Sequence, residues 1–115
     1  MAELIYKILN ANQWQDAVEK GVFAGSQVDL QDGFIHFSSA AQVQETADKH
    51  FAGQSDLVLV AVDPDTLPAD QLKWETSRGG ALFPHLYGTL LVTHAVSVAA
   101  IETDANGKHR ISVSR

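Results

Sequence analysis

Two histidines in this 115-residue sequence stand in surroundings that suit acid-base chemistry. His36 lies in the segment Gly-Phe-Ile-His-Phe-Ser (residues 33–38), and His85 lies in Phe-Pro-His-Leu-Tyr-Gly (residues 83–88). Because aromatic and aliphatic residues flank each imidazole, its ring nitrogens need partners, which are either protein groups or a ligand. One such histidine is ordinarily a satisfied core residue. Two of them in one small domain predict a shared cleft.

A second polar stretch, Trp-Glu-Thr-Ser-Arg-Gly-Gly (residues 74–80), supplies charged groups of both signs. Glu75 can act as a general base, accept a hydrogen bond from a ribose hydroxyl, or simply face solvent. Arg78 can donate two parallel hydrogen bonds to a phosphate or a carboxylate, and Gly79 beside it lets the backbone come close to a ligand. A flexible surface loop would have the same sequence, so both interpretations stay open.

Ser38, which ends the first histidine segment, and Ser39 precede a predicted helix over residues 40–51. Ser39, with a glutamine three residues later, has the spacing of a capping box. The free amides and the positive end of the helix dipole would lie beside His36 and Ser38, which predicts an anion site. In the alternative interpretation, the serines only cap the helix.

These features give one set of candidate site residues. Tyr87 joins the set because it lies two residues after His85, and an extended chain turns both side chains toward one side. Two imidazoles and a carboxylate would suit zinc or iron, but their spacing matches no metal motif, so no metal ligand is predicted. The predicted catalytic residues are His36, Glu75 and His85, and the predicted ligand-binding residues are Ser38, Ser39, Arg78, Gly79 and Tyr87.

Composition and charge narrow the classes of function. The formal net charge of -6 repels a phosphate backbone and the 8 lysines and arginines are scattered, so nucleic-acid binding is not expected. The absence of cysteine excludes disulfides and thiolate catalysis and fits a reducing compartment. No apolar run approaches the roughly 20 residues that span a bilayer, so we expect a cytoplasmic protein without a membrane segment. Residues 1–115 are expected to form a single domain.

The hydrophobic pattern predicts an α+β fold with two helices and a twisted, mainly antiparallel sheet of about six to seven strands. Asn106-Gly107 predicts a final hairpin with a type I′ turn. Residues 22–31 have little periodicity and are predicted to form a loop that can include a short strand at residues 28–30. The predicted helices cover residues 12–21 and 40–51, and the predicted strands cover residues 4–9, 34–37, 57–62, 72–75, 86–92, 95–104 and 108–113.

Residues 33–38, 74–75 and 83–88 together resemble the motifs of a family of small bacterial proteins catalogued as a domain of unknown function. The match runs nearly end to end. The fold of that family is similar to that of ADP-ribosyltransferases, which implies a split sheet and a cleft for a nicotinamide dinucleotide. ADP-ribosyltransferases usually carry a histidine or arginine on the first strand and a glutamate or other polar residue late in the chain. Here the first predicted strand has neither, no late Glu-x-Glu pair is present, and His36 stands where those enzymes often have tyrosine.

The leading hypothesis is a protein that binds a nucleotide-like or other small anionic ligand between the two histidines, Ser38 and Arg78. If the protein is an enzyme, the resemblance implies a transferase or hydrolase that acts at a ribosyl carbon of an NAD-like nucleotide. The histidines would then orient the ligand or act as acid and base, Glu75 would stabilise developing positive charge, and Arg78 would hold phosphate. One alternative is a non-catalytic binding module. Another is a protein-interaction domain that uses the edge of its terminal hairpin.

Overall fold

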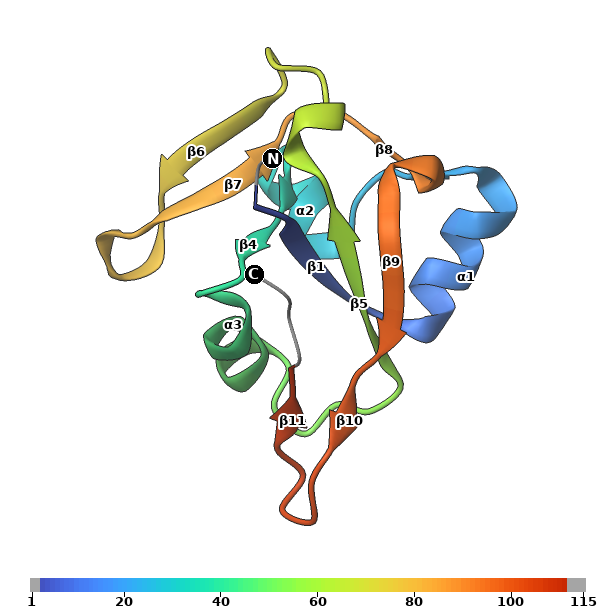
Figure 1. Cartoon of the computed structure of the whole chain (residues 1–115), viewed down its shortest axis with the longest axis vertical. Coiled ribbons are helices and arrows are strands. Elements are labelled where there is room, and N and C mark those ends of the chain that lie inside the picture. Colours follow the sequence, from blue (N-terminus) through green and yellow to red (C-terminus); the bar gives the residue numbers. More distant parts are fainter. Residues whose placement is uncertain (1–2, 112–115) are drawn as a thin grey trace.

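Residues 3–111, without the side chain of Arg78, are described by a computed structural model (Figure 1). Its centre is an antiparallel pair of strands, β1 (Ile5–Asn10) and β5 (Leu57–Val62), which are in register along their whole length. The unbroken apolar sequence of β5 suits a strand that is buried on both faces. β4 (Ser38–Ser39) flanks β1 and β9 (Ala95–Ala100) flanks β5, so the sheet has the order β4-β1-β5-β9.

A second sheet has the order β3-β7-β6 and lies at the upper left of Figure 1. It consists of β3 (Ile35–His36), β7 (Leu82–Leu86) and β6 (Leu72–Thr76), and neighbouring strands are antiparallel. Only Phe37 separates β3 from β4, and its N–H donates to the carbonyl of Pro84 at 2.9 Å. A single extended segment therefore passes from one sheet to the other.

Within residues 3–111, three α-helices pack around the sheets, where the sequence predicted two: α1 (Ala11–Lys20), α2 (Gln27–Asp32) and α3 (Val43–His50). The additional helix, α2, replaces the predicted loop and its short strand at residues 28–30, because Ser26 and Asp29 form a capping box and Gly33 ends the helix with a φ of 86°. α3 begins later than predicted because residues 40–42 form a turn, in which the N–H of Gln42 donates to the carbonyl of Ser39. In the described part of the chain, no helix is long and apolar enough to cross a bilayer.

The two faces of the four-stranded sheet carry separate apolar clusters. Along β1, Ile5 and Leu9 belong to the cluster against which Trp14 of α1 packs. The alternate residues Tyr6 and Ile8 belong to the other cluster, which includes the buried residues of α3. These residues follow the period of two that a strand imposes, so the sequence of β1 fixes which helix covers which face.

Most of the remaining strands are shorter than predicted, and residues 3–111 contain eleven strands in place of six to seven. The strand predicted over residues 86–92 is wrong, because β7 ends at Leu86 and the chain bends before β8 (Leu90–Leu91). β8 pairs with β2 (Val22–Phe23) in a separate two-stranded sheet. Three short 3-10 turns complete this part of the fold: η1 (Pro64–Thr66), η2 (Arg78–Gly80) and η3 (Val92–His94).

The terminal hairpin joins β10 (Glu102–Thr103) to β11 (His109–Arg110) at the lower end of the molecule (Figure 1). Its turn is closed by the N–H of Gly107, which donates to the carbonyl of Asp104 at 2.9 Å. Asn106 is then the second central residue and lacks the positive φ of a type I′ turn, so that prediction is wrong. Of the strand predicted over residues 108–113, the last two residues lie outside the described part.

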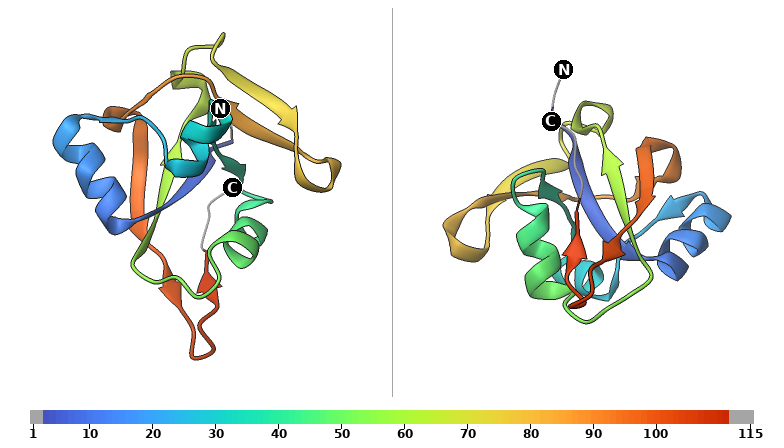
Figure 2. Two further views of the ribbon diagram at one scale, coloured as in Figure 1. Left: turned by 180° about the vertical axis from the view of Figure 1, so that it is seen from behind. Right: turned by 60° about the horizontal axis from the view of Figure 1, so that its bottom comes forward.

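β9 forms one edge of the four-stranded sheet. Within residues 3–111 it pairs with β5 alone. Its sequence, Ala-Val-Ser-Val-Ala-Ala, carries no charge, and Val96 and Val98 are 54% and 41% exposed. The views in Figure 2 show this strand along one side of the molecule. β9 is therefore a long, apolar and accessible sheet edge.

Candidate functional site

His36 and His85 are neighbours across the antiparallel pair of β3 and β7, in direct register. Their ring centroids lie 5.5 Å apart with an interplanar angle of 68°. Phe34, two residues before His36 on the same side of the chain, stacks on His85 at 4.1 Å between ring centroids. The structure thus brings together the two histidines that the sequence singled out, and we refer to His36 and His85 as the histidine pair.

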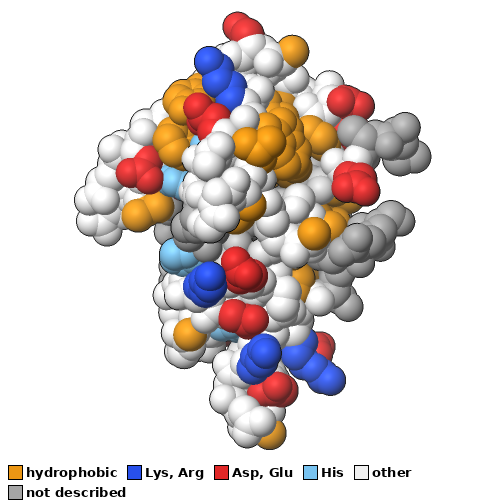
Figure 3. Space-filling view, turned by 90° about the vertical axis from the view of Figure 1, so that its left-hand side faces the viewer, with side chains coloured by type: hydrophobic (Ala, Val, Ile, Leu, Met, Phe, Trp, Pro, Cys, Tyr) orange, Lys and Arg blue, Asp and Glu red, His pale blue; other side chains and the backbone are white. Residues whose placement is uncertain are grey.

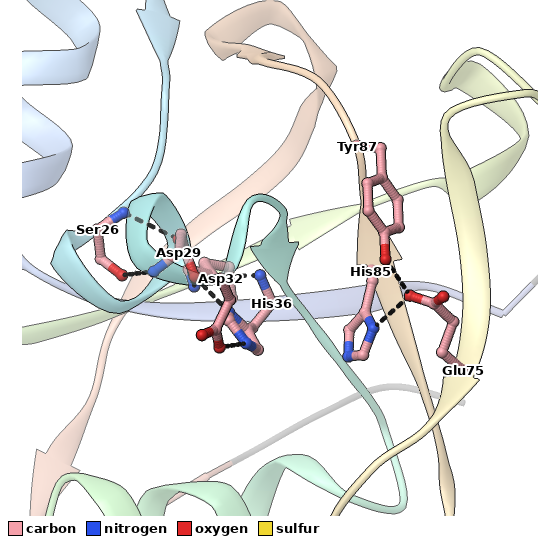
Figure 4. A network of polar contacts seen from close by, with 8 residues as sticks. Ser26, Asp29, Asp32, His36, Glu75, His85 and Tyr87 are labelled. Atoms are coloured by element: carbon pink, nitrogen blue, oxygen red, sulfur yellow. Dashed lines mark hydrogen bonds and ion pairs between the residues drawn. The ribbon is translucent and has the colours of Figure 1, made fainter.

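Both ring nitrogens of His36 face carboxylates. Nδ1 lies 2.6 Å from Asp29 Oδ1 and Nε2 lies 3.0 Å from Asp32 Oδ2 (Figure 4). Both carboxylates belong to α2, so this short helix sets the position of the ring. The two carboxylates therefore occupy both ring nitrogens of His36.

Asp29 is only 2% exposed and connects three segments of the fold. Its carboxylate accepts hydrogen bonds from the backbone N–H groups of Ser26 and His36 at 2.9 and 3.2 Å. The ammonium group of Lys7 lies 3.0 Å from each of its oxygens. Burial alone would raise the pKa of the Asp29 carboxyl, but the hydrogen bond from the His36 ring and the charge of Lys7 outweigh burial and hold this pKa below its usual value.

Lys7 itself is buried on β1, between two apolar core positions of the same face. Burial lowers the pKa of its ammonium group, and the neighbouring Asp29 charge opposes that change. The pair is thus a buried ion pair in which each charge depends on the other. Removal of either partner would leave the other charge uncompensated.

The ring of His85 is held in position by the carboxylate of Glu75. Its Nδ1 lies 2.9 Å from Glu75 Oε1, and the Tyr87 hydroxyl donates to the same oxygen at 2.7 Å (Figure 4). The hydrogen bond from Tyr87, followed by that from His85, lowers the pKa of the Glu75 carboxyl, and the bond to Glu75 raises the pKa of the Tyr87 phenol. Because Nδ1 donates to Glu75, Nε2 of the neutral His85 ring is an acceptor. Among the described side chains, Nε2 of His85 has no hydrogen-bond partner.

A cleft of about 730 Å³ opens beside the histidine pair. Its walls come from α2 and α3, from the edge of β1 and from the pair itself. β1 pairs with β4 only through Ile5 and Tyr6, and the cleft runs along the part of β1 beyond this pairing. We call this space the histidine cleft. Glu75 and Tyr87 lie behind His85 and are not among its lining residues.

The other predicted site residues do not lie together. Some lie on the two sides of β4, and others lie in η2. Ser38 lines the histidine cleft, and its hydroxyl lies 2.9 Å from that of Thr46 in α3. Ser39 lies on the opposite side of β4, away from this cleft. Gly79 lies in η2 with a φ of 67°. The side chain of Arg78 is outside the described part of the chain, so its predicted role stays a prediction.

Sequence reasoning missed Lys7, Asp29 and Asp32. Lys7 could have been found from its position, because a charged residue between two apolar residues of one strand face requires a buried partner. Asp29 could have been found from the Ser-x-x-Asp capping spacing that begins at Ser26. Asp32 has no such signal, because its contact with His36 exists only once α2 has formed. Within the described residues, no group of three or more His, Cys, Asp and Glu side chains could hold a metal ion.

Gly25→Ala is expected to destabilise the protein by about 1–3 kcal/mol, because the position before α2 has a φ of 130°. A Cβ atom there would also lie only 3.0 Å from Cβ of Asp29. Urea unfolding gives the change in the free energy of unfolding. Gly53→Ala is the matched control, since it also has a positive φ but no atom within 4 Å of the new Cβ. Equal losses in the two variants would contradict a role for crowding at Asp29.

Comparisons with known proteins identify relatives of undetermined function. Residues 8–98 match the sequence model of the family described as "Protein of unknown function (DUF952)". The chain is similar to protein CC0527 from Caulobacter crescentus, whose X-ray crystal structure has a TM-score of 0.89 at 53% identity and 93% coverage of each chain. The solution NMR structure of CC0527 has a TM-score of 0.80 at 54% identity and covers 90% of this chain and 89% of that one. No curated protein matches the sequence.

Proposed function

This chain belongs to the DUF952 family, and from the geometry of its cleft we propose that it binds a small anionic, nucleotide-like ligand beside the histidine pair. The observation that carries this proposal is the pairing of two imidazoles, each held by a carboxylate through Nδ1, at the wall of a 730 Å³ cleft. A cleft of this volume suits a small molecule. The absence of cysteine supports a cytoplasmic location as part of the same proposal.

The spacing of the pair favours binding of one anionic group. A carboxylate behind an imidazole stabilises the ring when it carries a proton, so Nε2–H of His85 can donate to an anion. Ring centroids 5.5 Å apart leave too little room for a phosphorus atom between the two rings. Because Asp29 and Asp32 already occupy both ring nitrogens of His36, His85 would donate to the phosphate or carboxylate, and the pair would not act from opposite sides of an in-line displacement. Asp32, which also lines the cleft, supplies an acceptor for a ribose hydroxyl.

The passage of one extended segment from β4 to β3 favours a second candidate, ribosyl transfer or hydrolysis on an ADP-ribosyltransferase-like fold. This passage divides the strands between two sheets, and the resemblance to ADP-ribosyltransferases implies such a split sheet. In this candidate an NAD-like nucleotide binds in the cleft, and the bond from the ribosyl carbon to its leaving group breaks as the bond to water or an acceptor forms. Ser38 and the histidine pair would orient the nucleotide, and Arg78 would hold its phosphate. Glu75 would act through His85 as a positioning residue.

His85→Asn is expected to abolish stabilisation by the ligand, and His85→Gln is expected to retain part of it. The amide of asparagine replaces Nδ1 and keeps the bond to Glu75, whereas the amide of glutamine replaces Nε2 and keeps a donor toward the cleft. The measurement is the melting temperature with NAD, ADP-ribose, other nucleotides and inorganic phosphate. A ligand at about 100 times its dissociation constant stabilises the fold by roughly 2.7 kcal/mol, which is several degrees for a domain of this size.

The control is His94→Gln, a histidine that does not line the histidine cleft. It should leave the ligand-induced shift unchanged. Stabilisation of wild type by a nucleotide without its consumption would support the non-catalytic binding module, and release of nicotinamide from NAD would support ribosyl chemistry. No shift with any compound, or an equal shift in wild type and His85→Asn, would overturn the proposal.

A further inference from the structure

A second hollow, of about 520 Å³, lies on the opposite side of β4 and β6 and shares no lining residue with the histidine cleft. Strand alternation explains the separation. In β4, Ser38 lines the histidine cleft and Ser39 lines this hollow. In β6, Leu72 and Trp74 line the hollow, while the intervening Lys73 is in register with His85. We call this hollow the Trp74 groove.

The lining of the Trp74 groove is mainly apolar, with Leu4, Leu67, Leu72 and Trp74 as its largest hydrophobic side chains. Trp74 is 48% exposed. Strand alternation would also have allowed Trp74 to face the core while the neighbouring Glu75 faced solvent. In the space-filling view of the face that carries β6 and β7, hydrophobic side chains gather in the upper half, with side chains of Asp or Glu and of Lys or Arg beside them (Figure 3). An accessible indole in a hollow is an anchor for an apolar group.

The charges at the groove have one sign. Glu3 and Asp65 line it, and its lining within residues 3–111 includes no lysine, arginine or histidine. The chain as a whole carries a formal net charge of -6, which adds to the attraction for a cation. An indole face also attracts cations through its ring quadrupole. The shape, the apolar lining and the negative charge of the Trp74 groove therefore all favour a ligand that is apolar and positively charged.

We infer that the Trp74 groove binds a small organic cation of the alkylammonium or arylalkylammonium class. Its apolar part lies against Trp74 and the leucines, and its ammonium group faces Glu3 and Asp65. The volume of the groove falls in the range of about 300–1,000 Å³ that is typical of small-molecule sites. This site is independent of the proposed anion site, because the two hollows are on opposite sides of β4 and have ligands of opposite charge.

The test is a titration of the full chain with phenethylammonium chloride, followed by NMR of the indole N–H groups. The protein has 2 tryptophans, and Trp74→Phe identifies which of the two signals belongs to Trp74. We expect a saturable shift of the Trp74 signal and no shift of the Trp14 signal. The neutral analogue 2-phenylethanol should bind about tenfold more weakly and the anionic 3-phenylpropionate should not bind, since each ion pair at a surface contributes a few-fold in affinity.

A variant with Glu3→Gln and Asp65→Asn provides the matched control. It should lose about tenfold in affinity for phenethylammonium and keep its affinity for 2-phenylethanol, which also shows that the groove is still folded. His85→Asn should not change the binding of phenethylammonium, so failure at this site and failure at the histidine cleft are distinguishable. Equal affinity for the three compounds, or none for phenethylammonium, would overturn the inference. A Trp74 shift that depends on protein concentration without ligand would assign the groove to a second copy instead.

Discussion

Asp29→Asn is expected to lower the free energy of unfolding by about 3–5 kcal/mol, which is the usual cost of breaking a buried ion pair from one side. The substitution keeps the size of the side chain but replaces one acceptor oxygen with a donor. That donor would face the ammonium group of Lys7, the backbone N–H groups of Ser26 and His36, or the His36 ring, all of which also donate. Urea unfolding followed by circular dichroism measures the loss.

The matched control is Asp32→Asn, at the second carboxylate that contacts His36. The Asp32 side chain is 51% exposed, so its contact with the ring is screened by water, and we expect a loss of at most about 1 kcal/mol. A change of less than about 1 kcal/mol in Asp29→Asn as well would show that the buried network does not stabilise the fold. Such a result would also remove the argument that α2 sets the position of His36.

The stability difference between wild type and Asp29→Asn is expected to disappear as the solution becomes acidic. The pKa of Asp29 is lower in the folded protein than its ordinary value of 3.8. The native state therefore binds fewer protons than the unfolded chain in the range between the two pKa values, and stability falls as the pH falls. The contribution of the Asp29 carboxylate to stability is fully present above about pH 5. It is lost progressively as the pH falls from the ordinary pKa of aspartate toward the lower pKa of Asp29 in the folded protein.

Urea midpoints of both proteins between about pH 2 and 7 measure this effect. Glu75 and Asp104 also have lowered pKa values in the folded protein, so wild type and variant should share an acid-dependent loss from these two groups. Their contribution cancels in the difference between the two proteins. A difference that stays constant over the whole range would mean that the ionisation of Asp29 is not what stabilises the folded state.

The parts of the fold that follow from local sequence were predictable. The apolar run of β5 and the alternation of β1 depend only on neighbouring residues, and both strands lie where they were predicted, within one residue at each end. α2 was missed although it has its own capping box and a terminal glycine, because the helix is too short to show an apolar period. The division of residues 86–92 was missed because the chain bends there to join two different sheets, and no local pattern encodes that choice.

The candidate site was predictable in its residue types and less so in its geometry. His36 and His85 were recognisable from their apolar neighbours, but their meeting depends on the register of β3 against β7, which is a contact between distant parts of the chain. Glu75 was expected to act as a general base, to accept a hydrogen bond from a ribose hydroxyl or to face solvent, and its contact with His85 was not foreseen, because it depends on the β6–β7 hairpin that turns its carboxylate toward the ring. Asp29 was missed for a related reason, since its partners lie on three different segments.

The uncharged edge strand β9 has a consequence for the colloidal behaviour of the protein. At neutral pH the net charge of -6 keeps copies apart, although Val96 and Val98 are accessible and β9, among the described residues, is paired along one side only. The isoelectric point calculated from the sequence is about 5.1, and there the repulsion between copies vanishes while the edge stays apolar. Edge-to-edge pairing of β9 should therefore make solubility lowest near this pH, and a lysine in place of Val98 would raise it.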